Sequence, residues 1–141
     1  MKITQLLQED KVTLSLEVFP PKKDTAVEQV SRSVREIAAL QPDFMSVTYG
    51  AGGGTSAYTV QIAKDIKAEY NVPSMAHLTC VSSTKETVKK QLECMQEAGI
   101  ENVLALRGDI PADAEFPLPD QFHYASDSLR WVGRRRQTFR Q

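Results

Sequence analysis

Residues 14–23 of this 141-residue chain read LSLEVFPPKK, and the interpretation of the fold starts from them. Polar and apolar side chains alternate over residues 13–19, which predicts a β-strand because neighbouring strand residues point to opposite faces. The two prolines that follow lack a backbone N–H and end the strand. The polar face carries Glu17, a carboxylate at the centre of an otherwise apolar strand.

Strand and helix then alternate along the chain. Further strands are predicted over residues 44–49, 74–81 and 102–107. Apolar residues at helical spacing predict helices over residues 27–38, 62–70 and 84–98. A capping box of Thr25 and Glu28 begins the first helix, and Gly99 ends the third. Because parallel strands need helical crossovers, four β-then-α units of about thirty residues each indicate the α/β class.

The two faces of the predicted strands differ in chemistry. One face is aliphatic throughout and comprises Leu14, Leu16, Val18, Met45, Val47, Ala76, Leu78, Leu104 and Leu106. The other is small or polar and comprises Ser15, Glu17, Ser46, Thr48, His77, Thr79, Ala105 and Arg107. A sheet with helices on both sides should be apolar on both faces, whereas a barrel has an outer and an interior layer. The pattern therefore favours a β/α (TIM-type) barrel, here an incomplete half barrel of about four β/α units.

A dinucleotide-binding fold is the main rival. Gly52, Gly54 and Ala57 match GxGxxA between a strand and a helix. That fold also requires an acidic residue about twenty positions further on, at the end of the next strand, to bind the ribose. The next strand reads SMAHLTCV and contains no acid. The glycines are interpreted as a loop that allows close approach of another group, with a plain flexible turn as the alternative.

Composition and charge limit which other classes of protein the chain can belong to. With 41% hydrophobic and 25% charged residues, the chain resembles ordinary globular proteins. It has no apolar run of the ~18 residues that a membrane helix needs and no signal-peptide pattern, so we expect a cytosolic location without a membrane span. All 18 acidic residues lie in residues 1–129, and the last twelve residues hold five arginines. A basic cluster confined to one terminus is not typical of nucleic-acid binding, and no nucleic-acid partner is predicted.

The cysteines do not indicate a metal site. Cys80 and Cys94 lie fourteen residues apart, without CxxC spacing, and both are predicted to be buried as small hydrophobic residues. His77 and Cys80 are three residues apart on one predicted strand, so their side chains should point to opposite faces. No metal is predicted.

Glu17 allows two interpretations. Inside a barrel, a charged carboxylate is costly, and burial favours the protonated form, which can donate a proton. Alternatively, Glu17 pairs with a buried cation, for which Arg107 across the barrel is a candidate. For Thr48 and His77 the corresponding alternatives are a role in binding and a satisfied polar group in the barrel core.

Five blocks of sequence resemble the methylenetetrahydrofolate reductase family. They are LEVFPPK at residues 16–22, FMSVTYGAGG at 44–53, AHLTC at 76–80, ALRGDIP at 105–111 and YASD at 124–127. The resemblance implies an eight-fold β/α barrel that binds FAD. It also implies that NADH or NADPH is used to convert 5,10-methylenetetrahydrofolate into 5-methyltetrahydrofolate, which feeds methionine synthesis.

The resemblance also assigns roles to individual residues. Glu17 matches the family's general acid, which protonates the folate so that its one-carbon bridge opens to an iminium. Asp109 matches an aspartate close to the flavin and the pterin. The positions that match FAD contacts are Thr48, Tyr49, His77, Leu106, Arg107, Gly108, Asp109, Tyr124 and Ala125.

The resemblance covers the amino-terminal half of a barrel. Residues 1–127 are predicted to form that half, and residues 128–141 a divergent, arginine-rich tail. Four strands leave two unpaired sheet edges, so we expect this chain to be a truncated or misread product that is inactive by itself. Two alternatives from another class are a homo-oligomer that pairs those edges and binds flavin without catalysis, and a fragment that interacts with a full-length partner.

Overall fold

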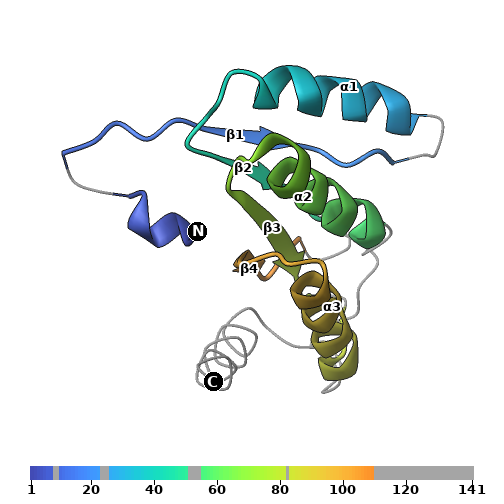
Figure 1. Ribbon diagram of the computed structural model, residues 1–141. Coiled ribbons are helices and arrows are strands. Elements are labelled where there is room, and N and C mark those ends of the chain that lie inside the picture. The colour runs from blue at the N-terminus through green and yellow to red at the C-terminus, as the bar shows by residue number, and fades with distance from the viewer. Residues whose placement is uncertain (8–9, 23–25, 51–54, 82, 110–141) are drawn as a thin grey trace.

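The computed structural model describes residues 1–7, 10–22, 26–50, 55–81 and 83–109. Four parallel strands form one sheet in the order β1 (Ser15–Val18), β2 (Phe44–Val47), β3 (Ser74–Thr79) and β4 (Asn102–Leu106). Three helices connect them, α1 (Val27–Ala38), α2 (Ser56–Tyr70) and α3 (Lys85–Glu97), and a short 3-10 helix η1 (Ile3–Gln5) precedes β1 (Figure 1). The predicted alternation of parallel strands and helices is confirmed.

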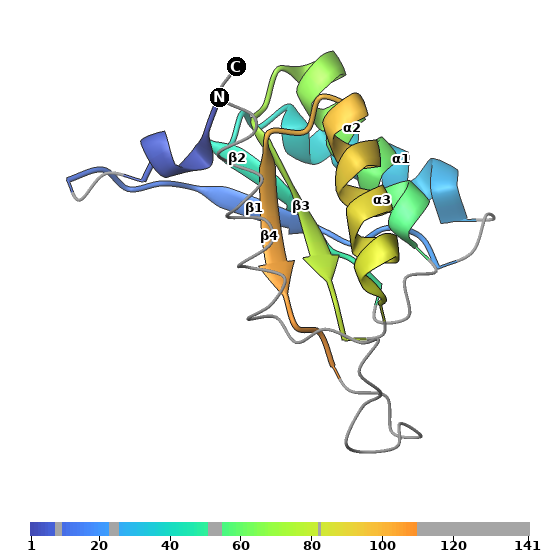
Figure 2. The ribbon, with the colours of Figure 1, turned by 90° about the horizontal axis from the view of Figure 1, so that it is seen from below.

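The strand order rules out the dinucleotide-binding rival. In that fold the chain reverses direction across the sheet and the helices cover both faces. Here each strand pairs with the next one in sequence, and α1, α2 and α3 all pack on the same face (Figure 2). Sequential order with helices on one side is the arrangement of consecutive units in a TIM-type barrel.

The hydrophobic core lies between the sheet and the helices. Strand residues Met45, Val47, Ala76 and Leu78 are almost fully buried there. The helices contribute apolar residues at helical spacing, namely Val34 and Ala38 from α1, Ile62, Ala63 and Ile66 from α2, and Val88 and Met95 from α3. Burying such side chains is the main favourable contribution to folding, and here it holds the sheet against its helical layer.

In strand β4, the residues that face the helices are the opposite set from the one predicted. Its register pairs Val103 with Ala76, Ala105 with Leu78 and Leu106 with Thr79. Laterally paired residues in a parallel sheet point to the same face, so Val103 and Ala105 face the helices while Leu104 and Leu106 face the other side. Leu104 and Leu106 are each 37% exposed, and Val103 packs on the core. The strand NVLAL is apolar almost throughout, so its sequence does not reveal which residues point inward.

Two burial predictions also need correction. Leu14 lies just before β1 and is 53% exposed, because the strand begins only at Ser15. Cys80 is buried as predicted, but Cys94 is exposed. The buried side of α3 is set by Val88 and Met95, and Cys94 falls beside that side rather than on it.

The helix ends follow their local signals with one difference. Thr84 caps α3 by accepting a hydrogen bond from the Thr87 N–H at 3.2 Å, and Gly99 follows the helix at φ +75°. The N-cap of α1 is Ala26, which makes no side-chain cap hydrogen bond, and Thr25 lies outside the described residues. Every helix in the described part of the chain is too short or too polar to span a bilayer.

Candidate active site

The polar face of the sheet brings three polar side chains together. Glu17 on β1 is the lateral neighbour of Ser46 on β2, and His77 lies on β3, one strand further. The Ser46 hydroxyl donates a hydrogen bond to Glu17 Oε2 at 3.2 Å. His77 Nε2 lies 3.4 Å from the same oxygen. We call these three residues the carboxylate cluster.

The carboxylate cluster lies on the face of the sheet opposite to the helices. Glu17 alternates with Leu16 and Val18, and Val18 packs into the core on the helix side. The Glu17 side chain is 46% exposed, whereas Ser46 and His77 are buried. Glu17 can therefore be reached by a ligand, while its two neighbours are held rigidly by the sheet.

Burial controls the charge of His77. Desolvation lowers the pKa of the imidazole, and the negative charge of Glu17 opposes part of this shift. A lowered pKa keeps His77 neutral at neutral pH. Among the described residues, its Nε2 atom is buried and has no hydrogen-bond partner, and the 3.4 Å contact with Glu17 does not count as one. The described part of the chain therefore does not supply the partner that a satisfied polar group of the core would have at Nε2.

The proposed partner of Glu17 is also corrected. Arg107 is exposed, and its Nε donates to the neighbouring Gly108 carbonyl at 3.2 Å. Within the described residues, the basic side chain that lies within 4 Å of the Glu17 carboxyl group is the imidazole of His77 and not Arg107. Arg107 lies just after the end of β4 and not within the strand.

Thr48 and Tyr49 follow the end of β2 and lie in different surroundings. The Thr48 backbone is fixed on both sides, since its N–H donates to the Val18 carbonyl at 3.0 Å and its carbonyl accepts from Thr59 Oγ1 at 2.8 Å. The Tyr49 ring belongs to the buried core, where desolvation raises the pKa of its hydroxyl and a hydrogen bond with Ser56 opposes the shift. Thr48 thus lies at the carboxyl end of the sheet, and Tyr49 supports it from the core.

Residues beyond β4 approach the end of β3. The Val81 N–H donates to the Arg107 carbonyl at 2.8 Å, which extends the pairing past the strand. Gly108 has φ +83°, and a Cβ placed on it would lie 2.9 Å from Thr79 Cβ. Only glycine allows the backbone to pass so close to β3. The turn presents Asp109, which is exposed, at the same end of the sheet as Glu17 and His77.

Two features of this end of the sheet bear on ligand binding. Among the described residues His77 Nε2 has no hydrogen-bond partner, and the turn at Gly108 passes close to Thr79. Tyr124, Ala125 and the glycines 52–54 lie outside the described residues. Among the described residues, no group of three or more His, Cys, Asp or Glu side chains could hold a metal ion.

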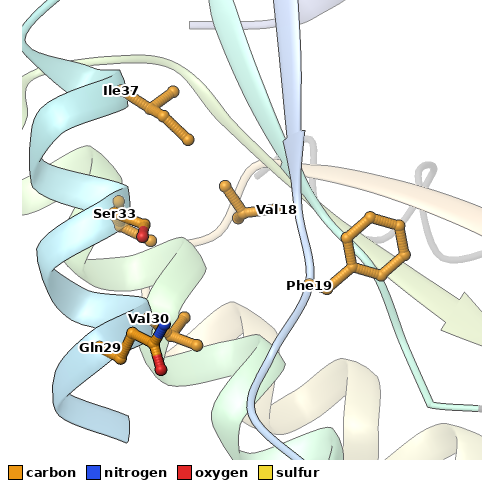
Figure 3. A pocket seen from close by; sticks show the side chains of 7 residues that line it. Val18, Phe19, Gln29, Val30, Ser33 and Ile37 are labelled. Carbon is orange, nitrogen blue, oxygen red and sulfur yellow. The ribbon is translucent and has the colours of Figure 1, made fainter. Parts of the chain in front are cut away.

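A hollow of about 390 Å³ lies elsewhere, between β1 and α1 (Figure 3). Its lining residues are Val18, Phe19, Gln29, Val30, Ser33, Val34 and Ile37. Figure 3 shows Val18 directed toward α1 and Phe19 directed away from it. The hollow therefore belongs to the helix side of an edge strand and is separate from the carboxylate cluster.

Sequence reasoning did not identify Ser46 as a member of the carboxylate cluster. It placed Ser46 on the polar face but did not single it out, because an isolated serine in a strand carries no motif. The pairing of β1 with β2, which sets Ser46 beside Glu17, identifies it.

The fold and the site together define a class of protein. Parallel β/α units with helices on one face and polar groups at the carboxyl ends of the strands are the arrangement of a TIM-type barrel enzyme, of which the described residues form three β/α units and a fourth strand. The family model for methylenetetrahydrofolate reductase matches residues 2–139, and the chain belongs to this family.

Individual relatives agree with the family assignment. The chain is 38% identical over 138 residues to methylenetetrahydrofolate reductase 1 of Schizosaccharomyces pombe, with 94% of this chain and 23% of that protein covered. It is 34% identical over 140 residues to methylenetetrahydrofolate reductase 2 of the same yeast, with 94% and 22% covered. The 5,10-methylenetetrahydrofolate reductase of Pectobacterium carotovorum subsp. carotovorum is 35% identical over 107 residues, with 76% and 36% covered. The chain thus spans between about a fifth and a third of the length of these relatives.

Proposed function

We propose that this chain supplies the acid and part of the flavin-binding surface of an FAD-dependent methylenetetrahydrofolate reductase. The observation that carries the proposal is the carboxylate cluster, in which half-exposed Glu17 lies 3.4 Å from buried, neutral His77 on the polar face of the barrel sheet. The reaction is the reduction of 5,10-methylenetetrahydrofolate to 5-methyltetrahydrofolate with NADH or NADPH, in one-carbon metabolism and in the cytosol.

The roles of the chain's own residues follow from their positions. Glu17 donates a proton to the folate, because its half-exposed carboxyl group lies on the polar face of the sheet, where a ligand can reach it. Asp109 places a negative charge beside the flavin and the pterin. Contacts with FAD come from Thr48, Tyr49, His77, Leu106, Arg107 and Gly108, and from Tyr124 and Ala125 outside the described residues. FAD, when bound, accepts and passes on the hydride.

The test separates the two half-reactions in a complete barrel. In a chimera, residues 1–109 replace the corresponding part of the Pectobacterium carotovorum enzyme. We expect Glu17→Gln to slow folate reduction by about 10²- to 10⁴-fold, the usual contribution of a general acid, and to leave flavin reduction by the nicotinamide nearly unchanged. The matched control is Glu36→Gln, the same change at an exposed position of α1, which should leave both half-reactions intact. Equal loss in both half-reactions would contradict the role of Glu17.

The 141-residue chain by itself is proposed to be inactive. Four described strands leave both β1 and β4 at sheet edges, so half of the pocket wall that a barrel provides must come from elsewhere. Turnover of methylenetetrahydrofolate by the purified chain, with its mass verified, would refute this part of the proposal.

The same edges favour a second candidate function. Two copies could pair β4 of one with β1 of the other, because all four strands run in the same direction and both edges are unpaired among the described strands. Such a homo-oligomer would bind flavin without catalysis. Co-purification of this chain with an intact reductase would instead support a role as an interacting fragment.

A further inference from the structure

The two oxygens of the Glu17 carboxyl group have different surroundings. Oε2 accepts the hydrogen bond from Ser46 and also faces His77 Nε2. Oε1 makes no hydrogen bond or ion pair with any residue that the structure describes. One oxygen is therefore held by the sheet, and the other is free to meet a ligand.

We propose that Ser46 is a positioning residue that holds Glu17 through Oε2, so that Oε1 is the atom that exchanges a proton with the substrate. The inference rests on the proposed role of Glu17 as the acid. It adds a residue, Ser46, that acts through Glu17 without touching the substrate, and His77, whose Nε2 lies 3.4 Å from Oε2, reports on the position of the carboxyl group.

Burial makes these two neighbours effective. Ser46 and His77 are only 6% and 8% exposed, so water does not compete strongly for their polar atoms. A buried hydroxyl without a partner is destabilising, and Glu17 Oε2 is the acceptor within reach of Ser46. The three side chains come from β1, β2 and β3, whose pairing fixes their separation.

The electrostatic surroundings of the cluster are simple. On the polar face, Ser46 of β2 and Thr48 just after β2 do not titrate in the ordinary pH range. Strand β3 contributes His77 itself. Arg107 and Asp109 lie beyond the end of β4 and are exposed. The charged side chains of α1, α2 and α3 belong to the other side of the sheet. Glu17 is accordingly the charge that acts on His77 in the described structure.

The test measures the titration of His77 by ¹⁵N NMR in the full 141-residue chain. The chain has two histidines, so His123→Gln leaves His77 as the single imidazole signal. We expect Glu17→Gln to move this titration to lower pH, because the anion that stabilises the protonated imidazole is removed. We expect Ser46→Ala to cause a smaller shift in the same direction, because the carboxyl group is no longer held near Nε2.

A double-mutant cycle shows whether Ser46 acts through Glu17. In the Glu17→Gln background, Ser46→Ala should cause no further shift. Ser15→Ala is the matched control, because it makes the same change at an exposed position on the same face of β1 and should leave the titration unchanged. Equal shifts from Ser46→Ala with and without Glu17, or no shift from Glu17→Gln, would overturn the proposal.

None of these measurements requires flavin or folate. A chain that fails to bind flavin would count against the proposed function while leaving this result standing.

Discussion

His77 illustrates how burial and a nearby charge act on a single residue. Desolvation is the larger influence and lowers the pKa of the imidazole, and Glu17 only partly offsets it. An imidazole of this kind can accept a hydrogen bond or donate one without carrying charge.

The lowered pKa of His77 predicts a pH-dependent stability. Above the unfolded value of about 6.5, the imidazole is neutral in both states and its contribution is fully present. As the pH falls, the unfolded chain takes up a proton first, so the free energy of unfolding decreases as the pH falls through the folded pKa. Urea unfolding between about pH 5 and pH 7 should show this slope, and His77→Gln should reduce it. Equal slopes in the two proteins would contradict the prediction.

Element ends carry two glycines that differ in their surroundings. Gly99 follows α3 at φ +75° with no atom within 4 Å of an added Cβ, whereas Gly108 follows β4 at φ +83° and would place a Cβ 2.9 Å from Thr79 Cβ. The first position demands only a left-handed backbone. The second demands that backbone and also the absence of a side chain.

This pair makes a matched test. We expect Gly99→Ala to lower the free energy of unfolding by about 1 kcal/mol, the usual cost of the left-handed conformation for alanine. Gly108→Ala should cost about 2–3 kcal/mol, because it adds steric overlap with β3 to the same strain. Chemical denaturation of the two variants measures both values. If the two costs were equal, the approach of the β4 end to Thr79 would not be as close as the structure shows.

At the scale of elements, the sequence predicted most of the sheet and its helices. Residues 44–49 and 74–81 form strands within those limits, and the helix signals around Thr84 and Gly99 lie where the structure has them. These features depend on neighbours a few residues away. The phase of β4 was wrong because Val103, Leu104, Ala105 and Leu106 are all apolar, and only the pairing with β3 decides which of them point toward the helices.

At the scale of the whole molecule, the two edges of the described sheet are the dominant feature. Neither β1 nor β4 pairs with a further strand among the described residues, and Leu104 and Leu106 on the polar face of β4 are 37% exposed. The hollow between β1 and α1 adds apolar surface from Val30, Val34 and Ile37 at the other edge. Exposed apolar groups beside open strand edges promote association.

We therefore expect the 141-residue chain to self-associate. Sedimentation velocity over a range of concentrations should show a species larger than the monomer. Leu104→Lys should weaken association, because it places a charge on the face that a second copy would cover. Leu40→Lys changes an exposed leucine just after α1 and should have little effect. A monomer at every concentration would contradict this expectation and the second candidate function.

The site shows the same division between local and distant information. The sequence marked Glu17 and His77 through their polar types within apolar strands and through the family blocks. It did not identify Ser46 as a partner of Glu17, and it suggested Arg107 instead. The contacts depend on which strands are adjacent and at what register, and residues 29 and 60 positions apart in the chain meet only after the sheet has formed.

The sequence by itself determined the α/β class, the alternation of strands and helices, and the family. These follow from the periodicity of apolar residues and from short blocks, both of which are local. The one-sided helical layer was predicted from the two strand faces and is confirmed, whereas only the tertiary structure decided the phase of β4 and the grouping of Glu17, Ser46 and His77. Hydrogen bonds between strands distant in sequence align those residues, and lateral pairing gives them their common face.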